Sequence, residues 1–473
     1  MNLPNINEAR KRTDKKTEYI YLKEEYDKSL FKGKKYFIRT YGCQMNVHDS
    51  EEIAGHLESI GFTEVDSIEE ADLVVLNTCA IRENAHDKLY GFLGRCKHVK
   101  TTSNPNLIIA ICGCMAQEEN VASTIMEKHP YVDLVFGTHN ICDLEKLLIN
   151  KSEKQNIEVF SCEGNVIENV PYKRDSKFKA WVNIQYGCDK FCTYCIVPYT
   201  RGKQRSRKSE DIIKECKDLV DNGYLEITLL GQNVNAYGKD LEGELNFAEL
   251  LKKVSDTGIK RLRFVTSHPW DFTDEMIDVI ANNDNIMPYI HLPLQSGSDK
   301  ILKLMGRRYT KEEYLTLFNK IKDKVKGCSI TTDIIVGFPN ETEEDFNETL
   351  DVVNKCKYDS AFTFIYSPRE GTPAAKIEDK IPLEVKEQRL HKLNEIINNY
   401  SLMHNKEYLD KEVEVLVEGL NEKDSTKVYG YTDTMKLVNF EGSKDLVGTL
   451  VKVIITDAKS FSLDGKLKKI EFK

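Results

Sequence analysis

Residues 186–195 read Tyr-Gly-Cys-Asp-Lys-Phe-Cys-Thr-Tyr-Cys and follow an apolar stretch typical of a strand. Cys188, Cys192 and Cys195 therefore stand in a C-x3-C-x2-C spacing. Three thiolates this close can hold a cubane cluster with one iron left open, whereas iron–sulfur clusters are usually held by four cysteines. A structural zinc site also closes with four ligands, and the nearest histidine on the C-terminal side is His268. The spacing favours an iron–sulfur cluster over zinc.

The same stretch resembles the radical S-adenosylmethionine (SAM) superfamily, in which an aromatic residue, here Tyr194, precedes the last cysteine of the motif. The resemblance implies that the open iron binds the amino and carboxylate groups of SAM. One electron from the cluster would then cleave SAM to a 5′-deoxyadenosyl radical. The protein would position and shield that radical, while the cofactor supplies the chemistry.

Length and composition indicate an ordinary globular protein. The 473 residues suffice for about three domains, and the net charge of −9 gives no global sign of nucleic-acid binding. The polar start, Met1 to Lys16, is unlike a signal peptide, and no apolar run approaches the ~20 residues of a membrane span. We therefore expect a cytoplasmic monomer, away from membranes, whose thirteen cysteines are reduced or bound to metal.

Changes in pattern predict an α/β fold in five segments. Residues 1–33 are an N-terminal extension, 34–150 alternate strands and helices, 151–177 are a polar linker, 178–408 are a second alternating series, and 409–473 contain short strands and turns. The first series predicts a Rossmann-like parallel sheet covered on both faces. The second, with six strand–helix units, predicts an incomplete TIM-like (β/α)6 barrel. The last predicts a small OB-like β-barrel, a shape often used to bind RNA.

Three cysteines follow three successive strands of the first series. Cys43 comes after the strand at 36–41, Cys79 after 71–78 and Cys114 after 107–112. Ligands bind at the carboxyl ends of strands in open α/β sheets, so the three thiols can converge on a second cluster. The alternative is that cysteine is simply a small buried hydrophobe. Cys112 competes with Cys114 as the third ligand, but it belongs to the strand, so Cys114 is favoured.

Two further segments of the second series are candidates for binding SAM. Gly231, Gln232 and Asn233 follow its second strand and offer a close backbone approach and two amides. Ile335, Val336 and Gly337 end a strand that resembles the adenine-binding strand of the radical SAM superfamily, which implies an apolar wall and backbone access. The alternative is an ordinary buried barrel strand.

Cations near the proposed site are candidates for contacts with RNA phosphates. The run at 200–208 and the Gly-Arg-Arg-Tyr at 306–309 supply the candidates, which are Arg201, Lys203, Arg205, Arg207, Arg307 and Arg308. A solvated surface run is the alternative for 200–208, and one or more of the arginines could instead bind the SAM carboxylate. Tyr309 could stack on a base.

The motifs together resemble the MiaB-type tRNA methylthiotransferases from residue 34 to the C-terminus. The resemblance rests on Tyr-Gly-Cys-Gln-Met-Asn at 41–46, Asn-Thr-Cys-Ala-Ile-Arg at 77–82, Gly-Cys-Met-Ala-Gln at 113–117, the cysteine triplet, Val-Pro-Tyr-Thr-Arg-Gly at 197–202 and Leu-Gly-Gln-Asn-Val-Asn at 230–235. The C-terminal strand pattern fits the TRAM domain with which this family holds tRNA.

The resemblance implies a transferase with two [4Fe–4S] clusters, the auxiliary one on Cys43, Cys79 and Cys114. One SAM would methylate a sulfur on that cluster, and a second would give the radical that activates carbon 2 of isopentenyl-adenosine beside the anticodon. Partners would be the tRNA anticodon stem-loop, a sulfur donor and an electron donor such as flavodoxin or ferredoxin. Related enzymes act on threonylcarbamoyl-adenosine or a ribosomal-protein aspartate, and a non-catalytic metal-containing RNA-binding protein is the alternative of a different class.

Overall fold

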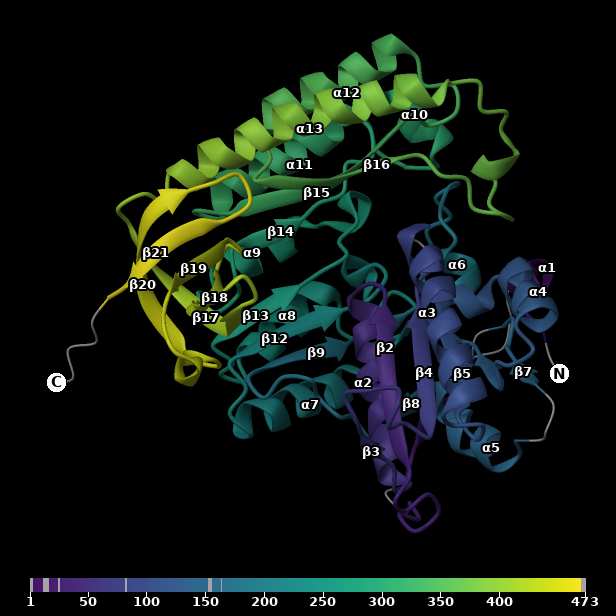
Figure 1. Cartoon of the computed structure of the whole chain (residues 1–473). Coiled ribbons are helices and arrows are strands. Elements are labelled where there is room, and N and C mark those ends of the chain that lie inside the picture. Colours follow the sequence, from purple (N-terminus) through teal and green to yellow (C-terminus); the bar gives the residue numbers. More distant parts are fainter. Residues whose placement is uncertain are drawn as a thin grey trace.

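The computed structural model describes residues 3–11, 17–23, 26–80, 83–151, 155–162 and 164–468. Figure 1 shows three parts: an N-terminal sheet with its helices, a central arch of strands and helices, and a small C-terminal barrel. Within these residues, every helix is too short or too polar to cross a membrane.

The N-terminal part is a six-stranded parallel sheet in the order β3-β2-β4-β5-β6-β7. Its strands are β2 (Lys35–Tyr41), β3 (Thr63–Glu64), β4 (Leu73–Thr78), β5 (Ile108–Gly113), β6 (Leu134–Phe136) and β7 (Asn156–Glu158). Every residue of β4 is buried, because α2 (Gln44–Ser59) packs on one face of the sheet and α3 (Glu83–Thr102) on the other. The continuous apolar run at 73–76 follows from burial on both faces.

The expected linker and N-terminal extension are both paired with the rest of the fold. Strand β7 begins within the predicted linker, at residues 156–158, and extends the sheet by pairing with β6. Farther along the linker, β8 (Val166–Glu168) pairs in parallel with β1 (Tyr19–Tyr21) of the extension. The short helix α1 (Ile6–Lys11) packs against α6 (Val197–Thr200), just past the 186–195 motif.

The central part is an open barrel of six parallel strands in chain order. One half contains β9 (Lys179–Asn183), β12 (Glu226–Leu230) and β13 (Arg261–Phe264); the other contains β14 (Tyr289–His291), β15 (Ser329–Val336) and β16 (Ser360–Ile365). A parallel bridge between Leu262 and Ile286 joins the halves. In the described residues β9 and β16 are the two edges, so the barrel is incomplete, as predicted.

Helices cover the outer face of this barrel. They are α7 (Ser209–Asp221), α8 (Phe247–Ser255), α9 (Asp274–Ala281), α10 (Asp299–Leu304), α11 (Lys311–Lys324), α12 (Glu343–Cys356) and α13 (Leu383–Lys406). Capping boxes at Asn246, Thr310 and Thr342 satisfy the first free N–H groups of α8, α11 and α12 and fix where these helices begin.

The C-terminal part is a closed five-stranded barrel, which confirms the predicted small β-barrel. Its strands are β17 (Glu412–Asn421), β18 (Asp424–Thr432), β19 (Leu437–Glu441), β20 (Leu450–Ala458) and β21 (Leu463–Leu467). We expected the last strand at 467–472; β21 lies earlier, and residues 469–473 are outside those described.

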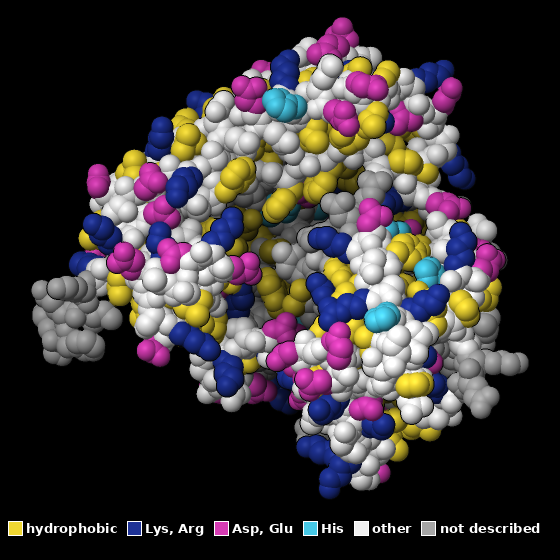
Figure 2. Space-filling model, viewed as in Figure 1, with side chains coloured by type: hydrophobic (Ala, Val, Ile, Leu, Met, Phe, Trp, Pro, Cys, Tyr) yellow, Lys and Arg dark blue, Asp and Glu magenta, His cyan; other side chains and the backbone are white. Residues whose placement is uncertain are grey.

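Two buried arginines of β13 attach this barrel to the central part. Arg263 donates to the backbone carbonyls of Thr432 and Asp433 at 2.8 and 2.7 Å. Arg261 donates to the carbonyls of Tyr431 and Glu414 at 2.9 and 3.0 Å. Figure 2 shows that the molecule is hollowed between the C-terminal barrel, the arch and the N-terminal part.

Candidate SAM and iron–sulfur sites

The loop after β9 and β10 (Gln185–Tyr186) brings Cys188, Cys192 and Cys195 together. Gly187 has a φ of +72°, and a Cβ there would lie 2.1 Å from the Lys203 carbonyl oxygen, so the loop requires glycine. Burial, and next the Cys192 and Cys188 thiolates, raise the pKa of Cys195. Burial likewise raises the pKa of Cys188 to about 11. Crowded buried thiols of this kind suit a metal cluster, which would hold them as thiolates.

Arg307 lies beside this triplet and not on the surface. Its guanidinium is buried, with one N–H 3.6 Å from the Cys192 sulfur and others donating to the Pro293 carbonyl and the Tyr309 hydroxyl, each at 3.0 Å. A buried cation next to a thiolate stabilises the charged form of the sulfur. The predicted phosphate contact therefore does not fit Arg307.

Tyr194 and Ile335 share one apolar cluster with Met305, Phe338 and Tyr366. The cysteine loop and the end of β15 therefore pack against the same apolar cluster. Val336 differs from the prediction: it is fully buried in the main core, because side chains alternate across a strand.

Gly337 also differs from its predicted role. Its N–H donates to a carboxylate oxygen of Glu341 at 2.7 Å, so that group is not available to a ligand. Its φ of +69° and a Cβ position 2.5 Å from the Lys386 side chain account for the glycine.

The amides after β12 hold the cysteine loop in place. Gln232 accepts a hydrogen bond from the Gly187 N–H, and Asn233 donates to Asp271 at 2.7 Å. Gly231 leaves room for the Gln185 side chain, which a Cβ would approach to 2.7 Å.

Asp271, which the sequence analysis missed, connects the segment after β12 with the cysteine loop. It pairs with Lys190, inside the cysteine loop, at 2.9 Å and with Lys239 at 2.7 Å. Burial opposes ionisation of this carboxyl, but hydrogen bonds from Lys239, Asn233 and Lys190 outweigh it and lower its pKa. The amides and Asp271 therefore fix the loop that carries the triplet.

The second triplet lies at the carboxyl ends of three adjacent strands. Cys43 follows β2 and precedes α2, Cys79 follows β4, and Cys114 follows β5. A hydrogen bond with Cys79 lowers the pKa of Cys43 to about 6, and the nearby Arg201 acts in the same direction. The Cys43 thiolate in turn contributes to the raised pKa of Cys114, after burial. The structure thus brings together the three cysteines that were predicted as one site.

Cys112 and Cys114 point into different surroundings. Cys112 is 1% exposed and belongs to the hydrophobic core between the sheet and α2. Cys114 begins the short helix η1 (Cys114–Gln117) and packs against Ile196 and Tyr199, beside the first triplet. These surroundings favour Cys114 over Cys112 as the third ligand.

Arg201 links the two triplets. It lies six residues after Cys195, and its Nε donates to the Cys114 sulfur at 3.2 Å. The same guanidinium pairs with Asp49 of α2 at 2.5 Å, and both side chains are buried. Six residues span at most about 20 Å, so the two cysteine sets are close neighbours in space. Asp49 is a second functional candidate that the sequence analysis missed.

The remaining predicted RNA-binding cations divide into buried and exposed groups. Arg207 is buried and pairs with Glu168 and Glu215 at 2.6 and 2.7 Å. Arg205 is buried and stacks on Tyr186, 5.7 Å from the ring centre. Lys203 is half-buried and Arg308 exposed. Four of the six cations are therefore buried inside the protein: Arg201, Arg205, Arg207 and Arg307. Neither phosphate contact nor a solvated surface run describes these four side chains.

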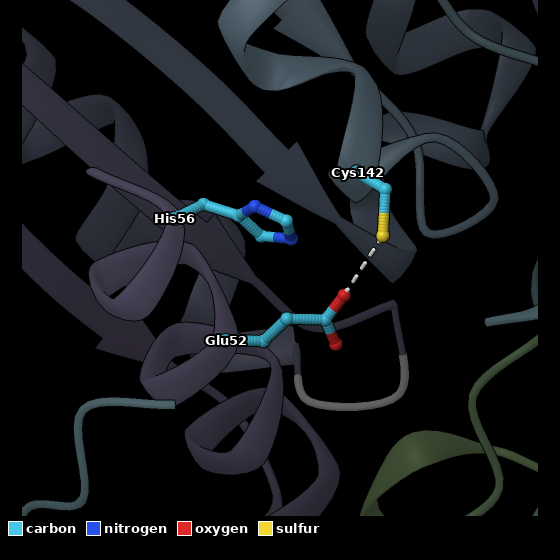
Figure 3. Close-up of side chains that lie close together, drawn as sticks. All are labelled: Glu52, His56 and Cys142. Atoms are coloured by element: carbon cyan, nitrogen blue, oxygen red, sulfur yellow. Dashed lines mark hydrogen bonds between the residues drawn. The ribbon is translucent and has the colours of Figure 1, made fainter. Parts of the chain in front are cut away.

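Glu52, His56 and Cys142 form a third polar cluster, on α2 and η2 (Ile141–Asp143) (Figure 3). Their potential ligand atoms all lie within 4.8 Å of one another. The Cys142 thiol donates to Glu52 at 3.4 Å. Burial raises the pKa of Glu52 to about 7 and lowers that of His56 to about 4, so the cluster favours uncharged side chains.

Three family models match the chain in succession. They are the uncharacterized protein family UPF0004 over residues 35–137, the radical SAM superfamily over 182–353 and the TRAM domain over 406–468. Radical SAM membership goes with the use of an iron–sulfur cluster and SAM. In fold, the chain is similar to the radical SAM methyltransferase TsrM from Kitasatospora setae, with a TM-score of 0.52, 14% identity and coverage of 75% of this chain and 78% of that one.

Curated relatives match nearly the whole chain. The tRNA-2-methylthio-N(6)-dimethylallyladenosine synthase of Shouchella clausii is 54% identical over 98% of this chain and 90% of its own length. The synthase of the same name from Bacillus subtilis is 52% identical over 98% and 92%, and that of Bacillus mycoides 55% over 95% and 88%. The chain therefore belongs to the MiaB-type methylthiotransferase family of the tRNA-2-methylthio-N(6)-dimethylallyladenosine synthases.

Proposed function

We propose that this protein transfers a methylthio group to carbon 2 of isopentenyl-adenosine at position 37 of tRNA, beside the anticodon. Relatives that align with this chain over nearly their whole length are named for this activity. One structural observation supports the proposal most: Arg201, six residues after Cys195, donates to the Cys114 sulfur, so the two sets of three cysteines lie near each other. Sulfur insertion at an unreactive carbon needs a sulfur source and a radical source at one place.

Two [4Fe–4S] clusters and SAM, when bound, would supply the methylthio group and the radical. Cys188, Cys192 and Cys195 would hold one cluster, and Cys43, Cys79 and Cys114 the other. Tyr194 and Ile335 would form the apolar wall of the SAM site and exclude water from it. Arg307 and Arg201 would place positive charge beside the cluster ligands Cys192 and Cys114.

The hollow seen in Figure 2 is the proposed place for the anticodon stem-loop. Lys203 and Arg308 are the predicted cations that remain outside the core, and the C-terminal barrel would hold RNA at the edge of the hollow. A sulfur donor, a flavodoxin- or ferredoxin-type electron donor, a monomeric state and a cytoplasmic location are parts of the same proposal.

Nucleoside mass spectrometry tests the proposal. Isopentenylated tRNA is incubated without oxygen with the reconstituted protein, SAM and a reductant. We expect a methylthio adduct on isopentenyl-adenosine. An adduct only on threonylcarbamoyl-adenosine or on the ribosomal-protein aspartate would contradict the proposed substrate, and absence of both adduct and 5′-deoxyadenosine in iron-loaded protein would contradict the radical mechanism.

Two cysteine variants separate the two sites. Cys192→Ala should abolish formation of 5′-deoxyadenosine, because the cluster that binds SAM would lose a ligand. Cys79→Ala should still form 5′-deoxyadenosine but install no sulfur. Cys162→Ala, at an exposed cysteine far from both sets in sequence, is the control and should behave as the wild type. Normal product from Cys79→Ala would refute the auxiliary site.

A further inference from the structure

Strand β16 exposes two phenylalanines. Phe362 is 59% exposed and Phe364 50% exposed, although both lie within strand β16. Figure 2 shows hydrophobic side chains along the underside of the arch, where Figure 1 places β16. Exposed apolar groups gathered in a concave face mark a binding surface.

Packing of the fold accounts for only one face of this strand. Ala361 and Ile365 pack against the barrel core, and the Thr363 hydroxyl bonds Asn394 of α13. Because side chains alternate, Phe362 and Phe364 point to the opposite face, into the open barrel. The described helices pack on the other side, so these two rings are left for a ligand.

The neighbours of the two rings connect them with the proposed reaction centre. Phe364 is the register partner of Ile335, which packs against the same apolar cluster as Tyr194 of the cysteine loop. Phe362 is the partner of Asp333 on β15, and its ring meets His291 of β14 edge-on at 6.0 Å between centres. The phenylalanines therefore form the outer end of a surface that leads to the proposed apolar wall of the SAM site.

The polar groups beside the rings favour a base over a phosphate. Asp333 has a side chain 29% exposed, and its carboxylate lies 3.3 Å from His291. A carboxylate repels a phosphate but accepts hydrogen bonds from the N–H groups of a nucleobase. Unpaired bases also stack on aromatic rings regardless of sequence.

We propose that Phe362 and Phe364 are a stacking platform for unpaired bases of the RNA loop that carries the reacting adenosine. The inference rests on the proposed function and adds the surface that positions the loop. Asp333 and His291 contact the edge of the stacked base and limit its sliding along the strand.

Binding of an anticodon stem-loop with 2-aminopurine at a loop position tests the platform. Phe362→Ala and Phe364→Ala should each raise the dissociation constant by about 10-fold, which is within the range for loss of one base–aromatic stack. Quenching of 2-aminopurine by the protein should fall in parallel. Phe364→Tyr keeps the ring and should bind as the wild type does. Phe160→Ala, at an exposed phenylalanine of the N-terminal part, is the matched control.

The outcomes separate this inference from the proposed function. The binding assay needs no turnover, so it reports on the platform even if isopentenyl-adenosine is not the reacting nucleoside. Unchanged affinity and quenching in both alanine variants, with unchanged thermal midpoints, would overturn the platform. A loss of affinity seen only with isopentenylated RNA would also overturn it, because the rings would then bind the prenyl chain.

Discussion

Arg201→Met should destabilise the protein strongly, because it leaves the buried Asp49 carboxylate without its cation. Arg201 and Asp49 are 6% and 4% exposed and lie 2.5 Å apart. Removing one partner of such a buried pair costs about 3–5 kcal/mol. Methionine preserves most of the volume of the side chain, so the loss reports mainly on charge.

A double-mutant cycle measures the pair directly. Asp49→Asn alone should also be destabilising, whereas the double variant Arg201→Met/Asp49→Asn should lose about 1–3 kcal/mol less than the sum of the single losses. Urea unfolding of reconstituted protein without oxygen, followed by circular dichroism, gives the free energies. Arg308→Met, at an exposed arginine, is the control and should change stability by less than about 0.5 kcal/mol.

A second measurement on the Arg201→Met variant reports on the hydrogen bond between Arg201 and Cys114. Loss of a hydrogen bond to a coordinating sulfur should change the electron paramagnetic resonance spectrum of the auxiliary cluster and leave that of the other cluster unaltered. Additive single losses, or a loss below about 1 kcal/mol for Arg201→Met, would refute the bridging role.

Two further predictions concern the buried polar groups. The pKa of Glu52 is raised in the folded state to about 7. The protonated Glu52 side chain therefore contributes fully to stability when the pH is below the ordinary pKa of glutamate, and this contribution is lost as the pH rises through 7. Between pH 5 and 8 the wild type should lose up to about 3 kcal/mol relative to Glu52→Gln in urea unfolding; a pH-independent difference would contradict this. Arg263→Ala removes two bonds to the C-terminal barrel and leaves buried Glu226 unpaired, so trypsin should cleave between the barrel and α13 faster than in the wild type. An unchanged digestion pattern would mean that other contacts hold the barrel.

The sheets could be predicted because their strands are continuous apolar runs. Strands β12 and β15 begin and end where the sequence places them, at 226–230 and 329–336. The cysteine positions could be predicted too, because parallel strands bring their carboxyl ends to one edge. In both cases the local sequence carries the information.

The burial of the basic run could not be predicted, because its partners are distant in sequence. Arg207 pairs with Glu168, 39 residues before it, and Arg201 pairs with Asp49, 152 residues before it. Without those acids the run has the composition of a solvated surface segment. The strand pair β1–β8 was missed for a similar reason, since three-residue strands depend on tertiary contacts.

The iron content of the reconstituted protein, measured together with its Mössbauer spectrum, tests the central claim most directly. The account predicts about eight irons per chain as two [4Fe–4S] clusters, and about four in each of Cys79→Ala and Cys192→Ala. A wild type that holds only about four irons, or a Cys79→Ala variant that keeps about eight, would contradict the assignment of two cluster sites.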